Sequence, residues 1–254
     1  MHIHVPDTRH NLKDELMIRE HFEVGQTAVT IISGNEYAKV AKGAIFDARS
    51  QIERKIANDP FFGTTFEPYK SSDSDGCVVK RMCASSELAS VGPMAAVAGA
   101  IAEYAVESMV NAGSRHAIID NGGDIAMISD REVCIGIYAD INGKRLSMKM
   151  PPTDRIIGIC SSSASVGPSV SFGRSDISTV ISNNVALADA CATKLGNLIK
   201  GCNDLTWPLE EVCEIDGVIG CMAYCDGMTA ICGDVPELVA SAASDHIVTK
   251  VLFV

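Results

Sequence analysis

The sequence lacks several features that would assign it to a common functional class. It has no run of about 18 apolar residues, so we expect no membrane-spanning helix. Its net charge of −11 has the wrong sign for nucleic acid or for an anionic membrane surface, so neither is expected as a partner. Residues 1–7 contain no basic segment followed by an apolar one. We therefore expect no signal peptide and a cytoplasmic location.

Paired metal-binding cysteines are also missing. Ten cysteines are present, but none is spaced as Cys-x-x-Cys, which excludes a zinc ribbon and the common iron–sulfur motifs. Their abundance predicts free thiols in a reducing, anaerobic cytoplasm and not a disulfide scaffold. Cys160, beside a serine-rich segment, and Cys225, before a turn, are candidates for chemistry, although an inert core thiol is the more frequent role for each.

The composition is that of a globular protein, with 47% hydrophobic and 21% charged residues. The length of 254 residues allows one large domain or two intimately joined halves, and we treat 1–254 as a single domain. Residues 27–33 predict a strand, and the apolar spacing over 37–57 predicts a helix. Residues 77–82 are predicted to form a strand, and 234–238 to begin a short helix.

Residues 178–197 predict a strand that runs into a buried helix. Small and apolar residues fill 185–199, so the helix has no broad polar face and should be buried on most sides. Asp189 lies within it, and Thr193 follows one turn later on the same face. A buried carboxylate with a nearby hydroxyl suits a hard cation such as Mg²⁺ or Ca²⁺.

The alternative for this helix is structural. Asp189 would pair with Arg174 or Lys194, and Thr193 would hydrogen-bond to its own helix. Spacing by itself leaves both readings open.

Ala188-Asp189-Ala190-Cys191-Ala192-Thr193 resembles the Ala-Asp-Ala-x-Ala-Thr signature of the ApbE flavin transferases. Residues 118–125 resemble the strand and Gly-Gly-Asp of that family, and residues 159–163 resemble its Thr-Ser-Gly loop. The resemblance implies that Asp189 and Thr193 bind metal at a flavin site. It also implies an α+β fold of two T-fold-like halves, with antiparallel sheets and helix pairs.

Two further runs, 92–99 and 171–176, resemble more closely an uncharacterised ApbE-like family of anaerobic archaea and bacteria. That likeness implies a link to sulfide-dependent homocysteine synthesis. The chain departs from the family patterns at Ala98, where ApbE proteins have a lysine, and at Pro168, where the closer family often has a histidine. An early Met-Gly-Thr motif is also missing, so covalent flavin transfer is not expected.

Three segments are expected to line a ligand pocket, each with a plainer alternative. Small residues in 92–99 allow close approach of a ligand or of another helix. The turn at 121–124 could approach a ligand or be an ordinary β-turn. The serine-rich residues 161–173 could cradle phosphate or carboxylate, or form a flexible loop. The expected ligand-binding residues are Gly92, Met94, Ala98, Gly99, Asn121, Gly122, Gly123, Asp124, Ser161, Ser162, Ser163, Ser171, Arg174 and Asp176.

The leading prediction is a protein that binds a phosphate-bearing small molecule, such as a flavin or nucleotide, with Mg²⁺, in anaerobic sulfur and homocysteine metabolism. Asp189 and Thr193 are the expected metal ligands, and Asp189 and Cys160 the catalytic candidates. A Cys-based sulfur-relay accessory protein and a non-catalytic oligomeric binding protein are the alternatives. A partner enzyme of homocysteine synthesis and a homo-oligomer are expected from these functions.

Overall fold

An eight-stranded antiparallel sheet forms the centre of the protein in the computed structural model, which describes residues 17–141, 144–163 and 175–241. Ser171 and Arg174, two of the expected ligand-binding residues, lie outside these ranges. The strands in sheet order are β1 (Met17–Val24), β2 (Thr27–Gly34), β3 (His116–Asn121), β4 (Asp124–Ser129), β7 (Thr153–Ser162), β8 (Ile177–Ser182), β9 (Val218–Cys225) and β10 (Met228–Gly233).

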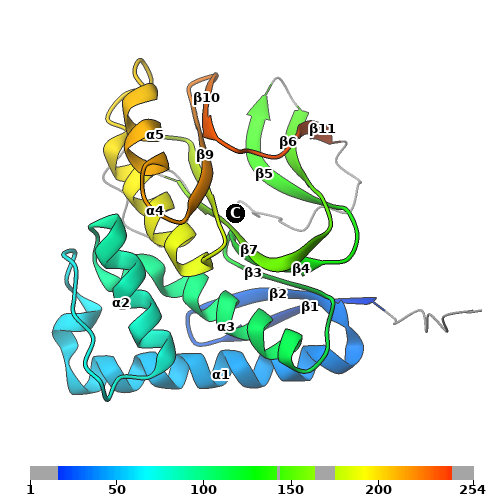
Figure 1. Cartoon of the computed structure of the whole chain (residues 1–254), viewed down its shortest axis with the longest axis vertical. Helices are drawn as coiled ribbons and strands as arrows, with labels where there is room; N and C mark the ends of the chain where they lie inside the picture. Colours follow the sequence, from blue (N-terminus) through cyan, green and yellow to red (C-terminus); the bar gives the residue numbers. More distant parts are fainter. Residues whose placement is uncertain (1–16, 142–143, 164–174, 242–254) are drawn as a thin grey trace, which may run out of the picture.

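The sheet is built from two related halves, each with two strands, a set of helices and two more strands (Figure 1). The first half carries α1 (Asn35–Asn58), α2 (Cys77–Ala89) and α3 (Val97–Asn111), with the short 3₁₀ helices η1 (Pro60–Gly63) and η2 (Pro93–Ala96). The second half carries α4 (Val185–Leu198) and α5 (Thr206–Cys213). Antiparallel pairing of β4 with β7 joins the halves. The predicted α+β fold of two related halves is confirmed.

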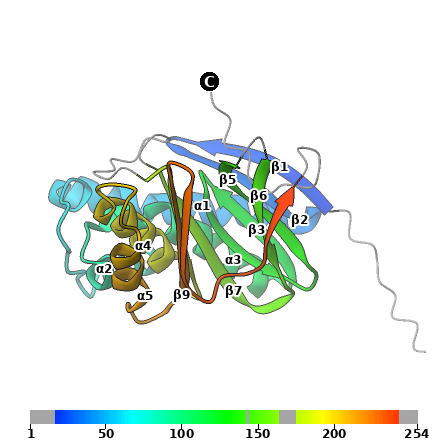
Figure 2. The ribbon, with the colours of Figure 1, turned by 90° about the horizontal axis from the view of Figure 1, so that it is seen from above.

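Both faces of the large sheet are covered (Figure 2). The helices pack on one face. A small sheet of β5 (Val133–Ile141), β6 (Lys144–Met150) and β11 (Leu238–Ser241) shares a second apolar core with the other. Neighbouring residues such as Ile118 and Ile119 therefore belong to different cores. This is why the central strands read as continuous apolar runs and not as alternating ones.

Two predicted elements are wrong. Residues 77–82 are helical, because Val78, Val79, Met82 and Cys83 are buried along one side of α2, a spacing that a six-residue window cannot display. Residues 238–241 form β11, which pairs with β6 and starts no helix. The strand at 27–33 and the helix at 37–57 match β2 and α1.

Among the described residues, no single helix is long and apolar enough to cross a membrane. One pair, α2 together with Pro93–Asn111, meets the length and composition requirement only jointly and is bent by 107°. Both helices contribute to the core between the sheet and the helical layer.

Candidate functional site

The first turns of α3 and α4 meet at one point of the molecule, and Gly99 makes the contact possible. A Cβ atom placed on Gly99 would lie 2.6 Å from the carbonyl oxygen of Val185 and 2.8 Å from the Cβ of Asp189. A side chain at position 99 would therefore push the two helices apart. From the small residues of segment 92–99 we expect close approach of a ligand or of another helix. At Gly99 the close neighbour is another helix, α4.

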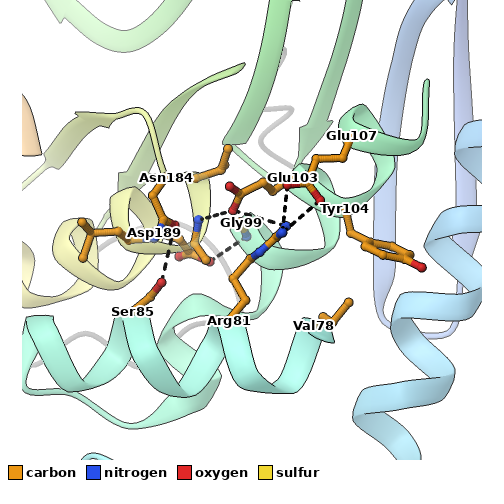
Figure 3. Close-up of polar contacts among 12 residues, drawn as sticks. Val78, Arg81, Ser85, Gly99, Glu103, Tyr104, Glu107, Asn184 and Asp189 are labelled. Atoms are coloured by element: carbon orange, nitrogen blue, oxygen red, sulfur yellow. Dashed lines mark hydrogen bonds and ion pairs between the residues drawn. The ribbon is translucent and has the colours of Figure 1, made fainter. Parts of the chain in front are cut away.

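Each of these helices caps the other (Figure 3). The amide of Gly99 donates a hydrogen bond to Asp189 Oδ2 at 2.8 Å, and the amide of Ala98 also bonds to this carboxylate. In return, the amide of Ala186 donates to Glu103 Oε2 at 3.2 Å. The first amides of a helix have no partner within the helix and carry partial positive charge, so a carboxylate stabilises them. Reciprocal capping thus fixes how α3 and α4 meet.

Local capping completes the start of α4. The side chain of Asn184 accepts a hydrogen bond from the amide of Leu187 at 2.9 Å and is the N-cap of the helix. Arg81 of α2 contacts two carboxylates of α3. Its guanidinium lies 3.6 Å from Glu103 and donates to Glu107 at 2.8 Å. Glu103 therefore has both amide and guanidinium partners.

Asp189 is buried as predicted, with 8% of its surface exposed. Burial raises the pKa of its carboxyl to about 7, while the amides of Gly99 and Ala98 act in the opposite direction. Lys194, one of its two expected ion-pair partners, lies 3.3 Å from Glu211 instead. The other, Arg174, is outside the described residues. Asp189 is thus held by backbone amides.

Asp124, at the start of β4, belongs to the same site. Its Oδ1 atom is buried and has no hydrogen-bond partner among the residues that the structure describes. Burial raises the pKa of its carboxyl well above the usual value, and the charges of Asp189 and Asp120 raise it further. The amide of Ser161 and the thiol of Cys160 act against these effects. Two desolvated carboxylates repel each other when both are ionised. A proton on one of them, or a bound cation, would offset this repulsion.

The turn before Asp124 brings this carboxylate to the helices. Asn121 and Asp124 are paired across a two-residue turn in which Gly122 and Gly123 have φ of 70° and 105°. The backbone is therefore an ordinary β-hairpin turn, as the plainer alternative predicts. The Asn121 side chain donates to the carbonyl of Ala98 at 3.0 Å. This bond docks the turn onto the start of α3.

Other expected pocket residues have structural partners elsewhere. A Cβ on Gly92 would lie 2.1 Å from the carbonyl oxygen of Thr65, so Gly92 allows two backbone segments to pack. Asp176 accepts a hydrogen bond from the amide of Asp226 at 2.8 Å, at the turn between β9 and β10. Met94, Ser162, Ser163 and Thr193 are buried or half-buried.

The two cysteines chosen from the sequence have no exposed thiolate. Cys160 is fully buried and lies 3.5 Å from the carbonyl of Val185. Burial raises the pKa of its thiol well above the usual range, helped by the charges of Asp124 and Asp189. Cys225 is buried and forms a disulfide with Cys202. The other eight cysteines are free, so the prediction of abundant free thiols holds apart from this one pair. Neither Cys160 nor Cys225 suits a sulfur relay.

The site fits an oxygen-coordinated cation. The unpartnered oxygen of Asp124 and the second oxygen of Asp189 are hard donors, and Thr193 lies one turn further along α4. In the described part of the chain, no three His, Cys, Asp or Glu side chains form a metal-holding group. This donor set suits Mg²⁺, which binds one or two carboxylates and completes its shell with water and phosphate oxygens.

Comparisons with known proteins agree with this fold. A family model described as "AbpE bacteria" matches residues 9–206. A UPF0280 protein of Methanothrix thermoacetophila is 46% identical over 92% of this chain and 100% of its own length. One from Archaeoglobus fulgidus is 43% identical, with the same coverage of both chains.

Two solved structures share the architecture. The flavin transferase ApbE from Vibrio cholerae superposes with a TM-score of 0.58 over 89% of this chain and 97% of that one. The ApbE protein from Thermotoga maritima gives 0.62 over 87% and 97%. Both are 12% identical to this chain, so the likeness describes the fold alone.

Proposed function

This chain belongs to the family described as AbpE bacteria, and from that premise we propose that it binds a phosphate-bearing small molecule with Mg²⁺ where α3 meets α4. The observation that carries the proposal is the pair Asp124 and Asp189, in which the buried Oδ1 atom of Asp124 has no hydrogen-bond partner in the described part of the chain. Ionised carboxylates in a desolvated site repel each other, and a divalent cation offsets both the repulsion and the desolvation.

The reciprocal capping favours a phosphate bound through a cation over a phosphate bound directly by helix N-terminal amides. Helix N-termini are common phosphate sites because their first amides are free. Here Asp189 and Glu103 already accept hydrogen bonds from the first amides of α3 and α4. A phosphate group would therefore be held through a cation for which Asp124 and Asp189 would be ligands, and not by these amides.

Mg²⁺ at this position would neutralise a pyrophosphate and stabilise a leaving group. Asp124 and Asp189 would supply its charged ligands and Thr193 a hydroxyl, and a flavin or nucleotide diphosphate would supply the remaining oxygens. Ala98 occupies the place of the lysine in ApbE proteins, so we propose binding or phosphate chemistry without covalent flavin transfer. Covalent flavin on a target peptide, after incubation with FAD and Mg²⁺, would contradict this part.

Melting with and without Mg²⁺ and a nucleoside diphosphate tests the site in three variants. Asp124→Asn and Asp189→Asn remove one ligand charge each, and the exposed Asp216→Asn is the matched control. At a 100-fold excess over Kd, ligand binding stabilises by about 2.7 kcal/mol, or roughly 5–10 °C for a chain of this size. We expect this shift in the wild type and in Asp216→Asn, and not in the other two.

Asp124→Asn is the cleaner test, because within the described residues Asp124 caps no helix, whereas Asp189→Asn also weakens the cap of α3. An Asp124→Asn protein that melts like the wild type without Mg²⁺ and fails to respond to it would support the metal site. Equal Mg²⁺ shifts in all four proteins, or none in the wild type, would rule it out.

We extend the proposal to sulfide-dependent homocysteine synthesis with a partner enzyme, on the strength of the sequence resemblance. A strain without this gene should need added homocysteine when sulfide is its sulfur source. The Asp216→Asn gene should restore growth and the Asp124→Asn gene should not. Normal growth of the deletion strain would contradict this role while leaving the binding site to be judged by the melting experiment.

A further inference from the structure

Five of the ten cysteines gather in the second half of the fold, away from the Asp124–Asp189 site. Cys202 and Cys225 are joined as a disulfide. Cys213, Cys221 and Cys232 are free and come from α5, β9 and β10. The proposed function uses none of them.

The three free thiols are in mutual contact. Cys221 and Cys232 are direct partners in the β9–β10 register. The sulfur of Cys213 lies against the next residue of β10, since a Cβ on Gly233 would be 2.7 Å from it. The Cys213 thiol is hydrogen-bonded to both Cys232 and Cys221. Three elements distant in sequence thus converge on one thiol cluster.

The three thiols of the cluster differ in how far they are exposed to solvent. Cys221 is fully buried and lies 3.4 Å from the carbonyl of Leu209. Cys213 and Cys232 are half-buried, and β10 is the last strand of the sheet. A small molecule that reaches this edge therefore meets Cys213 and Cys232 first.

We propose that Cys213 and Cys232 form a dithiol site that exchanges with low-molecular-weight disulfides. The thiolate of one cysteine attacks a sulfur of R–S–S–R, forming a mixed disulfide and releasing RS⁻, which takes up a proton. The second cysteine attacks the mixed disulfide and releases the other RSH. The products are two RSH and a Cys213–Cys232 disulfide, so the external disulfide is reduced by the two electrons that the protein thiols lose.

The surroundings set the rate of this exchange. Burial, followed by the hydrogen bond and charge of Cys232, raises the pKa of Cys213 to about 11. Only the thiolate attacks, so the reaction is slow at neutral pH. Its rate should rise about tenfold for each unit by which the pH is raised toward that pKa. The disulfide that forms would tie the end of α5 to the edge strand β10.

Oxidised glutathione is the probe for the experiment. The native full-length protein is incubated with it at several alkaline pH values, the remaining thiols are alkylated in denaturant, and the peptides are mapped by mass spectrometry. We expect a Cys213–Cys232 crosslink in the wild type and in Cys134→Ser, a half-buried control on β5. Cys213→Ser should lose the crosslink and hold glutathione on Cys232 instead.

A second measurement uses only the wild type, so its outcome does not depend on whether a variant folds. Phenylarsine oxide condenses with two adjacent thiols and releases water, so it should protect Cys213 and Cys232 together from alkylation. Glutathione attached separately to the two cysteines without a crosslink, a crosslink through Cys221, or full alkylation of both cysteines after either reagent would overturn the proposal.

Discussion

Replacing Gly99 with alanine should destabilise the protein, although alanine is the better helix former. Alanine gains about 0.5–1 kcal/mol over glycine within a helix. Against this, the new methyl group would lie 2.6 Å from the Val185 carbonyl oxygen and 2.8 Å from the Asp189 Cβ. Both atoms belong to α4 and cannot move as a flexible side chain would. The helices must separate, and the bond from the Gly99 amide to Asp189 lengthens.

The expected magnitude follows from these two losses. Overpacking costs about 1–3 kcal/mol, and a weakened hydrogen bond to a buried charged group costs about 1.5–3 kcal/mol. After the gain in helix propensity, the free energy of unfolding should fall by about 2–5 kcal/mol.

Gly43→Ala provides a control of opposite sign. Gly43 lies in α1, is exposed, and has no atom within 4 Å of the position that a Cβ would occupy. This variant should gain about 0.5–1 kcal/mol. Urea unfolding measures both, and a shifted midpoint with an unchanged slope identifies a change in stability. A Gly99→Ala protein as stable as the wild type would refute the close packing of α3 on α4.

Three further predictions concern a buried carboxyl group, a partly buried ion pair and the accessibility of two thiols. Burial raises the pKa of Asp120 to about 6. Its ionisation therefore disfavours folding, and the stability present below the unfolded pKa is lost as the pH rises through 6. Asp120→Asn should melt increasingly above the wild type between about pH 4 and pH 7, and parallel melting curves would contradict this. Arg81→Met should cost roughly 1–3 kcal/mol, because Glu103 loses its guanidinium partner. This loss should shrink in acid, where Glu103, whose pKa burial raises, takes up a proton. In native thiol labelling with mass mapping, the exposed Cys77 should react first and the buried Cys160 last, and early labelling of Cys160 would revive the sulfur-relay hypothesis.

Features of the fold that depend on a local pattern could be predicted from the sequence. The strand–helix unit around Asp189 and the cap at Asn184 are encoded within a few residues of where they act, so composition and spacing predict them. The same holds for the turn at Gly122 and Gly123. By contrast, a six-residue window at 77–82 showed β-branched residues but not the helical spacing that continues to residue 89.

Contacts between distant segments could not be predicted. Glu103 accepts a hydrogen bond from an amide 83 residues away, and only the fold reveals this partner. A signal was nevertheless present, since Glu103 is a charged residue in an otherwise small and apolar stretch of α3. The sequence points to Asp124 only as part of the turn at residues 121–124. Its unpartnered oxygen depends on β7 and α4, which follow later in the chain.

The reciprocal capping changes what the Asp189 motif can be taken to mean. One oxygen of Asp189 caps α3 through Gly99, so helix capping alone gives this carboxylate a structural role, whether or not a cation binds. The motif is therefore compatible with a member of the family that binds metal and with one that does not. Asp124 separates the two, because within the described ranges no hydrogen bond offsets the desolvation of its buried Oδ1 atom. A cation held by Asp124 and Asp189 would offset the desolvation of both carboxylates at once. A change at Asp124 is therefore a sharper test of the proposed metal site than a change at the motif residue Asp189.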